Sequence, residues 1–276
     1  MVVLSISKIR QSLIFPGSET QGRQIKIPPE FQDSLEGPID TDNGNRIFLL
    51  SGEALSNDKQ PSQTWLLYFY GNAMCLSDAN FDLNYFRQFG LNVVIPEYIG
   101  FGMSSGTASE SGCYETARAA YQYLTQTKGV QPDQIIVAGW SLGAAVATYL
   151  AEIQPVAALI LLSAFTNIPD EAVEIFPNVL KWLIPKWLIE LLIPERFNNL
   201  KRIAKVKCPI FISHGTEDEI VPFAMAKALR AKAKAKGIAV SFLPIPRAKH
   251  NEFFEVGGEQ LREGVTNFIA NLPHSY

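Results

Sequence analysis

The chain has 276 residues, of which 47% are hydrophobic and 18% are charged, and its formal net charge is −3. This composition excludes an intrinsically disordered chain, because such chains have too little apolar content to offset the entropy lost on ordering. The 24 Lys and Arg residues do not gather in one basic stripe, so no nucleic-acid partner is expected.

The first fifteen residues do not resemble a secretory signal, since Lys8 and Arg10 interrupt their apolar residues. Residues 179–194 are apolar but are broken by Lys, Pro and Glu, so no transmembrane helix is expected. Contact with a membrane surface and the oligomeric state stay open. The odd number of widely spaced cysteines argues against a disulfide framework or a zinc site, and a reducing, cytoplasmic location is predicted. These are Cys75, Cys113 and Cys208.

In chain order, residues 1–45 have weak periodicity and are expected to form loops and an antiparallel sheet edge. Short β-rich runs then alternate with longer segments of helical period, which is typical of a mostly parallel sheet with helices on both faces. The predicted strands are 46–51, 65–70, 92–95, 134–138, 158–162, 209–213 and 240–245. The predicted helices are 78–89, 114–128, 142–152, 223–236 and 259–271.

A Gly-Trp-Ser-Leu-Gly segment at residues 139–143 directly follows the apolar strand run 134–138 and opens the next helix. This context is that of a nucleophile elbow, a sharp strand-to-helix turn that exposes a serine hydroxyl above the sheet. The two glycines leave room for the turn, and the helix N-terminus directs its N–H groups toward developing negative charge. Ser141 is therefore the candidate nucleophile.

A serine needs a nearby base, and the chain has only three histidines. His250 follows the last predicted strand, and active sites of open α/β sheets lie at the carboxyl ends of their strands. His274 lies two residues before Tyr276, and His214 closes a buried strand, where a hydrogen-bonded structural histidine is the ordinary interpretation. His250 is therefore the candidate general base.

The acid is expected in the loop after the strand at 209–213, where Asp218 is the candidate. Glu217 and Asp170 remain alternatives. The chain order Ser141, Asp218, His250 is the order of triads in hydrolases of this architecture. The backbone N–H groups of Leu142 and Asn72 are the candidate oxyanion hole, since Asn72 follows Gly71 at the end of an early strand.

These residues resemble the α/β-hydrolase superfamily and, within it, the Bem46-like group, over residues 44–272. The resemblance rests on six segments: 71–73 (GNA), 97–104 (EYIGFGMS), 139–143 (GWSLG), 164–169 (AFTNIP), 214–222 (HGTEDEIVP) and 250–252 (HNE). It implies a mostly parallel eight-stranded sheet with helices on both faces. The group usually has His where this chain has Tyr70, and Asp where it has Glu97.

The resemblance and the residues together imply a serine hydrolase of the esterase, thioesterase or lipase-like kind (EC 3.1), which cleaves a small-molecule acyl ester or thioester through an acyl-enzyme on Ser141. No metal or organic cofactor is implied. A serine peptidase-like hydrolase is an alternative, although the chain is too short for a propeller domain. A catalytically silent module that binds a ligand or a protein is the other alternative, because fold alone does not decide function.

One domain, residues 1–276, is expected, with a small apolar cap inserted at residues 165–200. Insertions at this place in the fold cover the nucleophile, and an apolar cap suits an acyl chain. The same side chains could instead pack the cap onto the body. The candidate substrate contacts are Phe165, Phe176, Trp182 and Trp187.

Overall fold

The computed structural model describes residues 14–22, 28–55, 62–168 and 195–272. The chain divides into two compact units, Met1–Val137 and Ala138–Tyr276. The prediction of one domain with an inserted cap stays a prediction, because residues 169–194 of that cap lie outside the described residues.

The first unit contains four strands in the order β1-β2-β4-β3. β1 pairs with β2 and β2 pairs with β4 in antiparallel fashion, whereas β3 and β4 are parallel, with Leu66 opposite Val93. The antiparallel edge expected near the start of the chain is therefore present. The elements are η1 (Pro16–Thr20), η2 (Pro29–Ser34), β1 (Leu35–Asp40), β2 (Arg46–Gly52), β3 (Trp65–Phe69), α2 (Asn80–Arg87), β4 (Asn92–Pro96), α3 (Glu110–Gln122), η3 (Tyr123–Thr127) and η4 (Pro132–Gln134).

Strand β5 (Ile135–Trp140) leads into the second unit, where the strand order is β5-β6-β7-β8. β6 and β7 are parallel, as are β7 and β8. The remaining elements are α4 (Leu142–Ile153), β6 (Ala158–Leu162), α8 (Asn199–Arg202), η5 (Ile203–Lys205), β7 (Ile210–Gly215), α9 (Phe223–Lys234), β8 (Val240–Ile245) and α10 (Phe253–Ala270).

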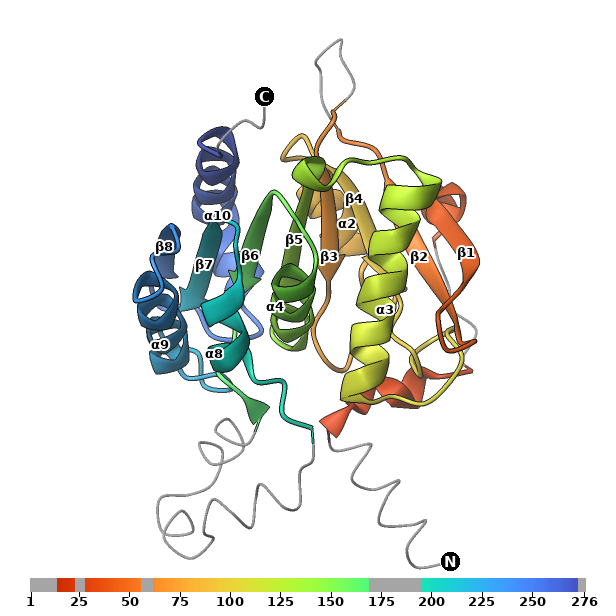
Figure 1. Ribbon diagram of the computed structural model, residues 1–276, viewed down its shortest axis with the longest axis horizontal. Coiled ribbons are helices and arrows are strands. Elements are labelled where there is room, and N and C mark those ends of the chain that lie inside the picture. The colour runs from red at the N-terminus through yellow and green to blue at the C-terminus, as the bar shows by residue number, and fades with distance from the viewer. Residues whose placement is uncertain (1–13, 23–27, 56–61, 169–194, 273–276) are drawn as a thin grey trace, which may run out of the picture. The chain divides into compact units, whose positions relative to one another are not determined.

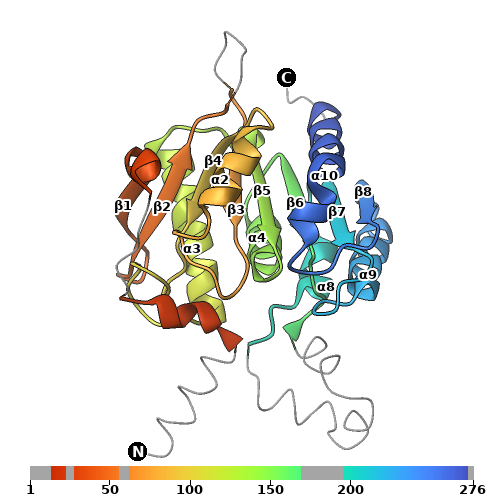
Figure 2. The ribbon, with the colours of Figure 1, turned by 180° about the vertical axis from the view of Figure 1, so that it is seen from behind.

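Helices cover both faces of the strands within each unit. In the first, Figure 1 shows α3 in front of the strands, and Figure 2, from behind, shows α2 on the opposite face. In the second, α4 and α10 lie on opposite faces. Every residue of β4, β6 and β7 is buried, because both faces of these strands are covered, which explains their continuous apolar runs. The predicted α/β class with eight strands, mostly parallel, is confirmed.

Two helix starts differ from the predictions by four residues or more. α3 begins at Glu110 and not at 114, because the Ser109 hydroxyl caps it by accepting a hydrogen bond from Gly112 N at 3.0 Å. α10 begins at Phe253 because a short helical segment precedes a kink at Gly258, where the backbone is not helical (φ 8°, ψ −98°), and the predicted start at 259 lies directly after this kink. Among the described residues, no helix combines the length and hydropathy needed to cross a bilayer.

Candidate active site

Ser141 is the single residue between the end of β5 and the start of α4. Its backbone has φ 54° and ψ −116°, a conformation that is strained for a residue with a side chain. Such a sharp turn requires Gly139, because a Cβ at this position would lie 2.1 Å from the carbonyl oxygen of Gly143. Ser141 N also donates to the carbonyl of Leu162, at 3.0 Å, which ties the turn to β6.

The structure brings together the three residues predicted to form a triad. His250 Nε2 lies 3.2 Å from Ser141 Oγ, and His250 Nδ1 lies 2.8 Å from Asp218 Oδ2. The imidazole is almost fully buried, and the carboxylate is also buried. One ring nitrogen of His250 faces the Ser141 hydroxyl, and the other faces the Asp218 carboxylate. The imidazolium that forms when His250 accepts the serine proton would therefore be stabilised by the negative charge of Asp218.

Asp218 is held in its ionised form by its hydrogen-bond donors. Its Oδ1 accepts from the backbone N–H groups of Ile220 at 3.0 Å and Val221 at 2.7 Å. Burial by itself would raise the pKa of Asp218, but hydrogen bonds from His214, His250 and Val221 N hold this pKa well below its usual range. Of the two alternative acids, Glu217 is exposed, and Asp170 lies outside the described residues.

His214 also contacts the acid, a relationship that the sequence did not predict. Its Nε2 lies 2.8 Å from the carbonyl oxygen of Val221 and 3.3 Å from Asp218 Oδ2. Both are acceptors, so this nitrogen carries the proton, and Nδ1 has no hydrogen-bond partner among the described residues. The separation of four residues between His214 and Asp218 in the sequence is a weak indication of this contact, because no local pattern shows that the loop folds back.

Trp140 makes a second contact that the sequence pattern did not predict. Its ring stacks on the imidazole of His250, with centroids 5.1 Å apart and planes 27° apart, and packs edge-on against Phe254. The stacking limits rotation of the imidazole, and an aromatic face stabilises a cation above it. Trp140 therefore favours the orientation in which His250 faces both Ser141 and Asp218.

The two candidate oxyanion donors have different local settings. Leu142 is the first residue of α4, where N–H groups lack intrahelical acceptors. Asn72 follows β3 in a turn in which Ala73 has φ 64°. Its side chain accepts from Ala73 N at 3.1 Å and donates to the carbonyl of Ile14 at 2.6 Å. The Asn72 side chain thus holds the turn, and the donor role of its backbone N–H stays a prediction.

Comparison with known proteins identifies the family. A family model described as the prolyl oligopeptidase family matches residues 80–271. The "Alpha/beta hydrolase domain-containing protein 17B" of Xenopus tropicalis is 31% identical over 84% of this chain and 75% of its own length. "Protein bem46" of Schizosaccharomyces pombe is 28% identical over 96% of this chain and 89% of its own length.

The chain belongs to the prolyl oligopeptidase family of α/β-hydrolases, in its Bem46-like group. The Pyrococcus furiosus esterase Pf2001 matches this hydrolase with a TM-score of 0.69 and 17% identity, over 92% of this chain and 97% of that one. A butyrate-bound esterase of Thermogutta terrifontis matches with a TM-score of 0.67 and 17% identity, over 92% and 100%. The α/β-hydrolase fold is therefore confirmed.

The predicted substrate contacts of this hydrolase fall mostly outside the described residues. Phe176, Trp182 and Trp187 lie within residues 169–194. Phe165 follows β6 and is 2% exposed, and its carbonyl accepts from Asn199 Nδ2 at 2.9 Å. The structure thus places Phe165 in the interior, in contact with Asn199 of α8.

The three cysteines are the other candidate reactive groups of the chain. Cys75, Cys113 and Cys208 are free thiols. Burial raises the pKa of the Cys113 thiol well above its usual range and that of Cys208 to about 12, so neither is an activated nucleophile. Within the described part of the chain, no three His, Cys, Asp or Glu side chains form a group that could hold a metal ion.

Proposed function

We propose that this hydrolase cleaves carboxylic esters or thioesters of acyl substrates through an acyl-enzyme on Ser141. The observation that carries the proposal is the hydrogen-bonded series from Ser141 Oγ to His250, at 3.2 Å, and from His250 to Asp218, at 2.8 Å. A serine hydroxyl is a weak nucleophile at neutral pH unless a base removes its proton as it attacks. This geometry supplies the base and the carboxylate that orients it.

In the first half of the proposed reaction, Ser141 Oγ attacks the acyl carbon while its proton moves to His250 Nε2. The N–H group of Leu142, the first residue of α4, stabilises the oxyanion. His250 then gives the proton to the leaving oxygen or sulfur, and the acyl group stays on Ser141. In the second half, water loses a proton to His250, attacks the acyl carbon and releases the acid, and His250 returns the proton to Ser141.

The nature of the similar proteins supports an ester substrate. Several of the solved structures that share the fold are named esterases, and one holds butyrate. The matching family is named for a peptidase, so peptide substrates are the second candidate. Esters and thioesters are favoured over peptides as substrates because an alcohol or thiol leaves more readily than an amine. These leaving groups therefore need less assistance from protonation by His250.

Labelling with a fluorophosphonate probe tests the activated serine directly. The wild type is expected to label and to hydrolyse p-nitrophenyl acyl esters and acyl thioesters, whereas Ser141→Ala and His250→Ala lose both activities. A folded wild type that neither labels nor hydrolyses these substrates would favour the silent binding module. Faster turnover of peptide p-nitroanilides than of esters would favour the peptidase instead.

A further inference from the structure

Two buried polar atoms of the second unit lie on neighbouring strands, and each lacks a partner. Ser163 directly follows β6, and His214 lies near the end of β7. Both residues are 0% exposed, and neither Ser163 Oγ nor His214 Nδ1 has a hydrogen-bond partner among the described residues. Since buried polar atoms are nearly always hydrogen-bonded, this pair requires an explanation.

Backbone hydrogen bonds place Ser163 between the proposed nucleophile and His214. β6 and β7 lie side by side (Figure 1) and are parallel, with Leu162 opposite Ser213. Ser163 N continues this ladder by donating to Ser213 O at 3.0 Å, which puts Ser163 beside His214. On the other side, Ser141 N donates to Leu162 O at 3.0 Å. Ser141, Ser163 and His214 therefore form one row across the ends of β5, β6 and β7.

The two unpartnered atoms are chemically complementary. His214 Nε2 carries the ring proton, because it faces two acceptors, Val221 O at 2.8 Å and Asp218 Oδ2 at 3.3 Å. In a neutral imidazole the other nitrogen, Nδ1, is then an acceptor, and the Ser163 hydroxyl is a donor. Neighbouring strands are about 4.8 Å apart. Rotation of the Ser163 side chain about χ1, or one buried water, therefore brings the donor to the acceptor.

The backbone of Ser163 supports a role for its side chain. Its φ is 47°, in the left-handed region that strains a residue with a Cβ and that glycine adopts freely. Ser141, the other strained serine in the row, has φ 54° and carries the proposed nucleophile. Glycine would fit the backbone at position 163 better than serine. A hydroxyl that bonds His214 explains why the strain is tolerated.

We propose that Ser163 is a positioning residue of the triad, which donates a hydrogen bond to His214 Nδ1. The inference rests on the proposed function, because its effect on catalysis passes through Asp218. With a donor at Nδ1, His214 keeps its proton on Nε2, next to the carboxylate oxygen that His250 Nδ1 contacts at 2.8 Å. The series Ser163, His214, Asp218, His250 and Ser141 then begins and ends in the same row.

Loss of the Ser163 donor leaves His214 less well defined. The ring can then turn over or carry its proton on Nδ1, because nothing else bonds this nitrogen among the described residues. Either change removes a donor from Asp218, and the carboxylate becomes less precisely directed toward His250. A catalytic group must be held within about 0.5 Å of its productive position, so the rate is expected to fall.

The kinetic test compares kcat and KM for p-nitrophenyl butyrate in Ser163→Ala, His214→Phe and the double variant. Ser163→Ala is expected to lower kcat about fivefold, which corresponds to one neutral hydrogen bond. KM is expected to change less than about twofold, because the bond does not contact substrate. The kcat of the double variant should lie within about twofold of that of His214→Phe, since Ser163 acts through His214. Losses that multiply in the double variant would contradict the inference.

Ser213→Ala is the matched control for both tests. Ser213 is also buried beside His214, but its hydroxyl bonds Leu243 O at 2.8 Å. This variant is therefore expected to keep kcat. A loss of kcat in Ser213→Ala as large as that in Ser163→Ala would show that any buried hydroxyl in this region has the same effect, and the inference would fail.

Nitrogen NMR of histidine-labelled protein tests the hydrogen bond itself, a readout that a change in stability alone leaves unchanged. The chain has three histidines, so the signals of His214 are identified by their loss in His214→Phe. In the wild type, His214 should carry its proton on Nε2. The Nδ1 signal should move to higher chemical shift in Ser163→Ala, because it loses its donor, and stay in place in Ser213→Ala. The same Nδ1 signal in the wild type and Ser163→Ala would overturn the inference, whatever the kinetic result.

Ser163→Gly separates the hydroxyl from the backbone. Glycine removes the donor but relieves the strain at φ 47°, so this variant should have a higher urea midpoint than Ser163→Ala and the same lowered kcat. Wild-type kcat in Ser163→Gly would refute the inference, even if Ser163→Ala fails to fold. In that case ester hydrolysis by the wild type leaves the proposed function standing. If the wild type hydrolyses no ester or thioester, the proposed function fails, and the NMR comparison still decides whether the hydrogen bond forms.

Discussion

The Nε2 atom of His214 lies 3.3 Å from Asp218 Oδ2, the same carboxylate oxygen that His250 Nδ1 contacts at 2.8 Å. Two imidazoles therefore share one oxygen of the proposed acid. Because His214 also donates to the carbonyl of Val221, it holds the loop that carries Asp218 at two points. His214 acts through Asp218, and it does not contact Ser141 in any described interaction.

His214→Phe is therefore expected to lower kcat by about tenfold and the free energy of unfolding by about 1–3 kcal/mol, because two buried acceptors lose their donor. His214→Gln keeps an amide donor near the Nε2 position and should recover part of both losses. Ser213→Ala is the control, since its hydroxyl bonds Leu243 O at 2.8 Å on the neighbouring strand. Ser213→Ala should lower the free energy of unfolding without lowering kcat. An unchanged kcat in His214→Phe would show that His214 does not position Asp218 for catalysis.

Ser141→Gly and Ser141→Ala should both abolish hydrolysis but differ in stability. The backbone of residue 141 has φ 54°, which strains any residue that has a Cβ by about 1–3 kcal/mol. Glycine relieves this strain and loses about 0.5–1 kcal/mol of chain entropy. Urea unfolding is expected to show Ser141→Gly as the more stable variant by about 1 kcal/mol. Equal midpoints would show that the elbow is not strained.

Gly139→Ala should prevent the elbow from forming. The new Cβ would lie 2.1 Å from Gly143 O and 2.2 Å from Gly143 C, backbone atoms that cannot move without shifting α4. A loss of more than about 3 kcal/mol is expected. Gly237→Ala, where φ is 75° and nothing lies within 4 Å of the new Cβ, should cost only about 1–2 kcal/mol. Similar losses in both variants would show that a small shift of the backbone relieves the collision at Gly139.

Stability is expected to fall as the pH rises from about 4.5 to above 7. Burial raises the pKa of both Asp82 and Glu97 to about 7 in the folded protein, above the unfolded values near 4. In this window the folded state binds more protons, so each raised pKa contributes stability that is present below the unfolded pKa and is lost as the pH passes the folded one. Asp82→Asn should flatten the pH dependence of the urea midpoint. A midpoint that rises between pH 5 and 8 would contradict this assignment.

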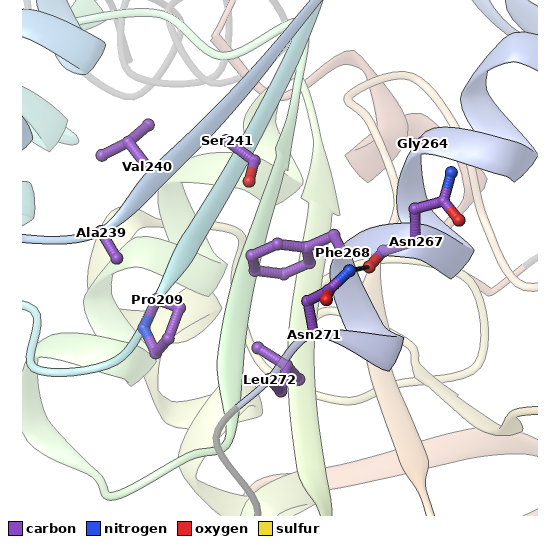
Figure 3. A pocket seen from close by; sticks show the side chains of 9 residues that line it. All are labelled: Pro209, Ala239, Val240, Ser241, Gly264, Asn267, Phe268, Asn271 and Leu272. Atoms are coloured by element: carbon purple, nitrogen blue, oxygen red, sulfur yellow. Dashed lines mark hydrogen bonds between the residues drawn. The ribbon is translucent and has the colours of Figure 1, made fainter.

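The pocket lined by Asn267, Asn271 and Phe268 lies on α10 and β8, with a volume of about 530 Å³ (Figure 3). Asn271 Nδ2 donates to Asn267 O at 2.7 Å along its own helix. None of the triad residues lines this pocket. Substitutions such as Asn267→Ala are therefore expected to leave ester hydrolysis unchanged, which a kcat measurement would check.

Much of the fold was accessible from sequence because buried parallel strands are continuous apolar runs, as in β6 and β7. The first residues of the helices were harder to predict from the sequence. The start of α3 depends on the cap at Ser109, and α10 has a short helical segment before its kink at Gly258, where two adjacent glycines indicate a break. The kink agrees with the glycines, whereas the segment before it was not predicted, and its Phe253 is fully buried.

The sequence by itself determined the elbow around Ser141, because a buried strand, two glycines and a helix start are consecutive in the chain. It also predicted His250 and Asp218, from their order after successive strands, and left Glu217 and Asp170 as alternative acids. Only the tertiary structure decided that His214 shares the carboxylate of Asp218 and that Tyr70 bonds Glu97. Such contacts depend on how loops fold back and on which strands become neighbours, and no local pattern in the sequence records either.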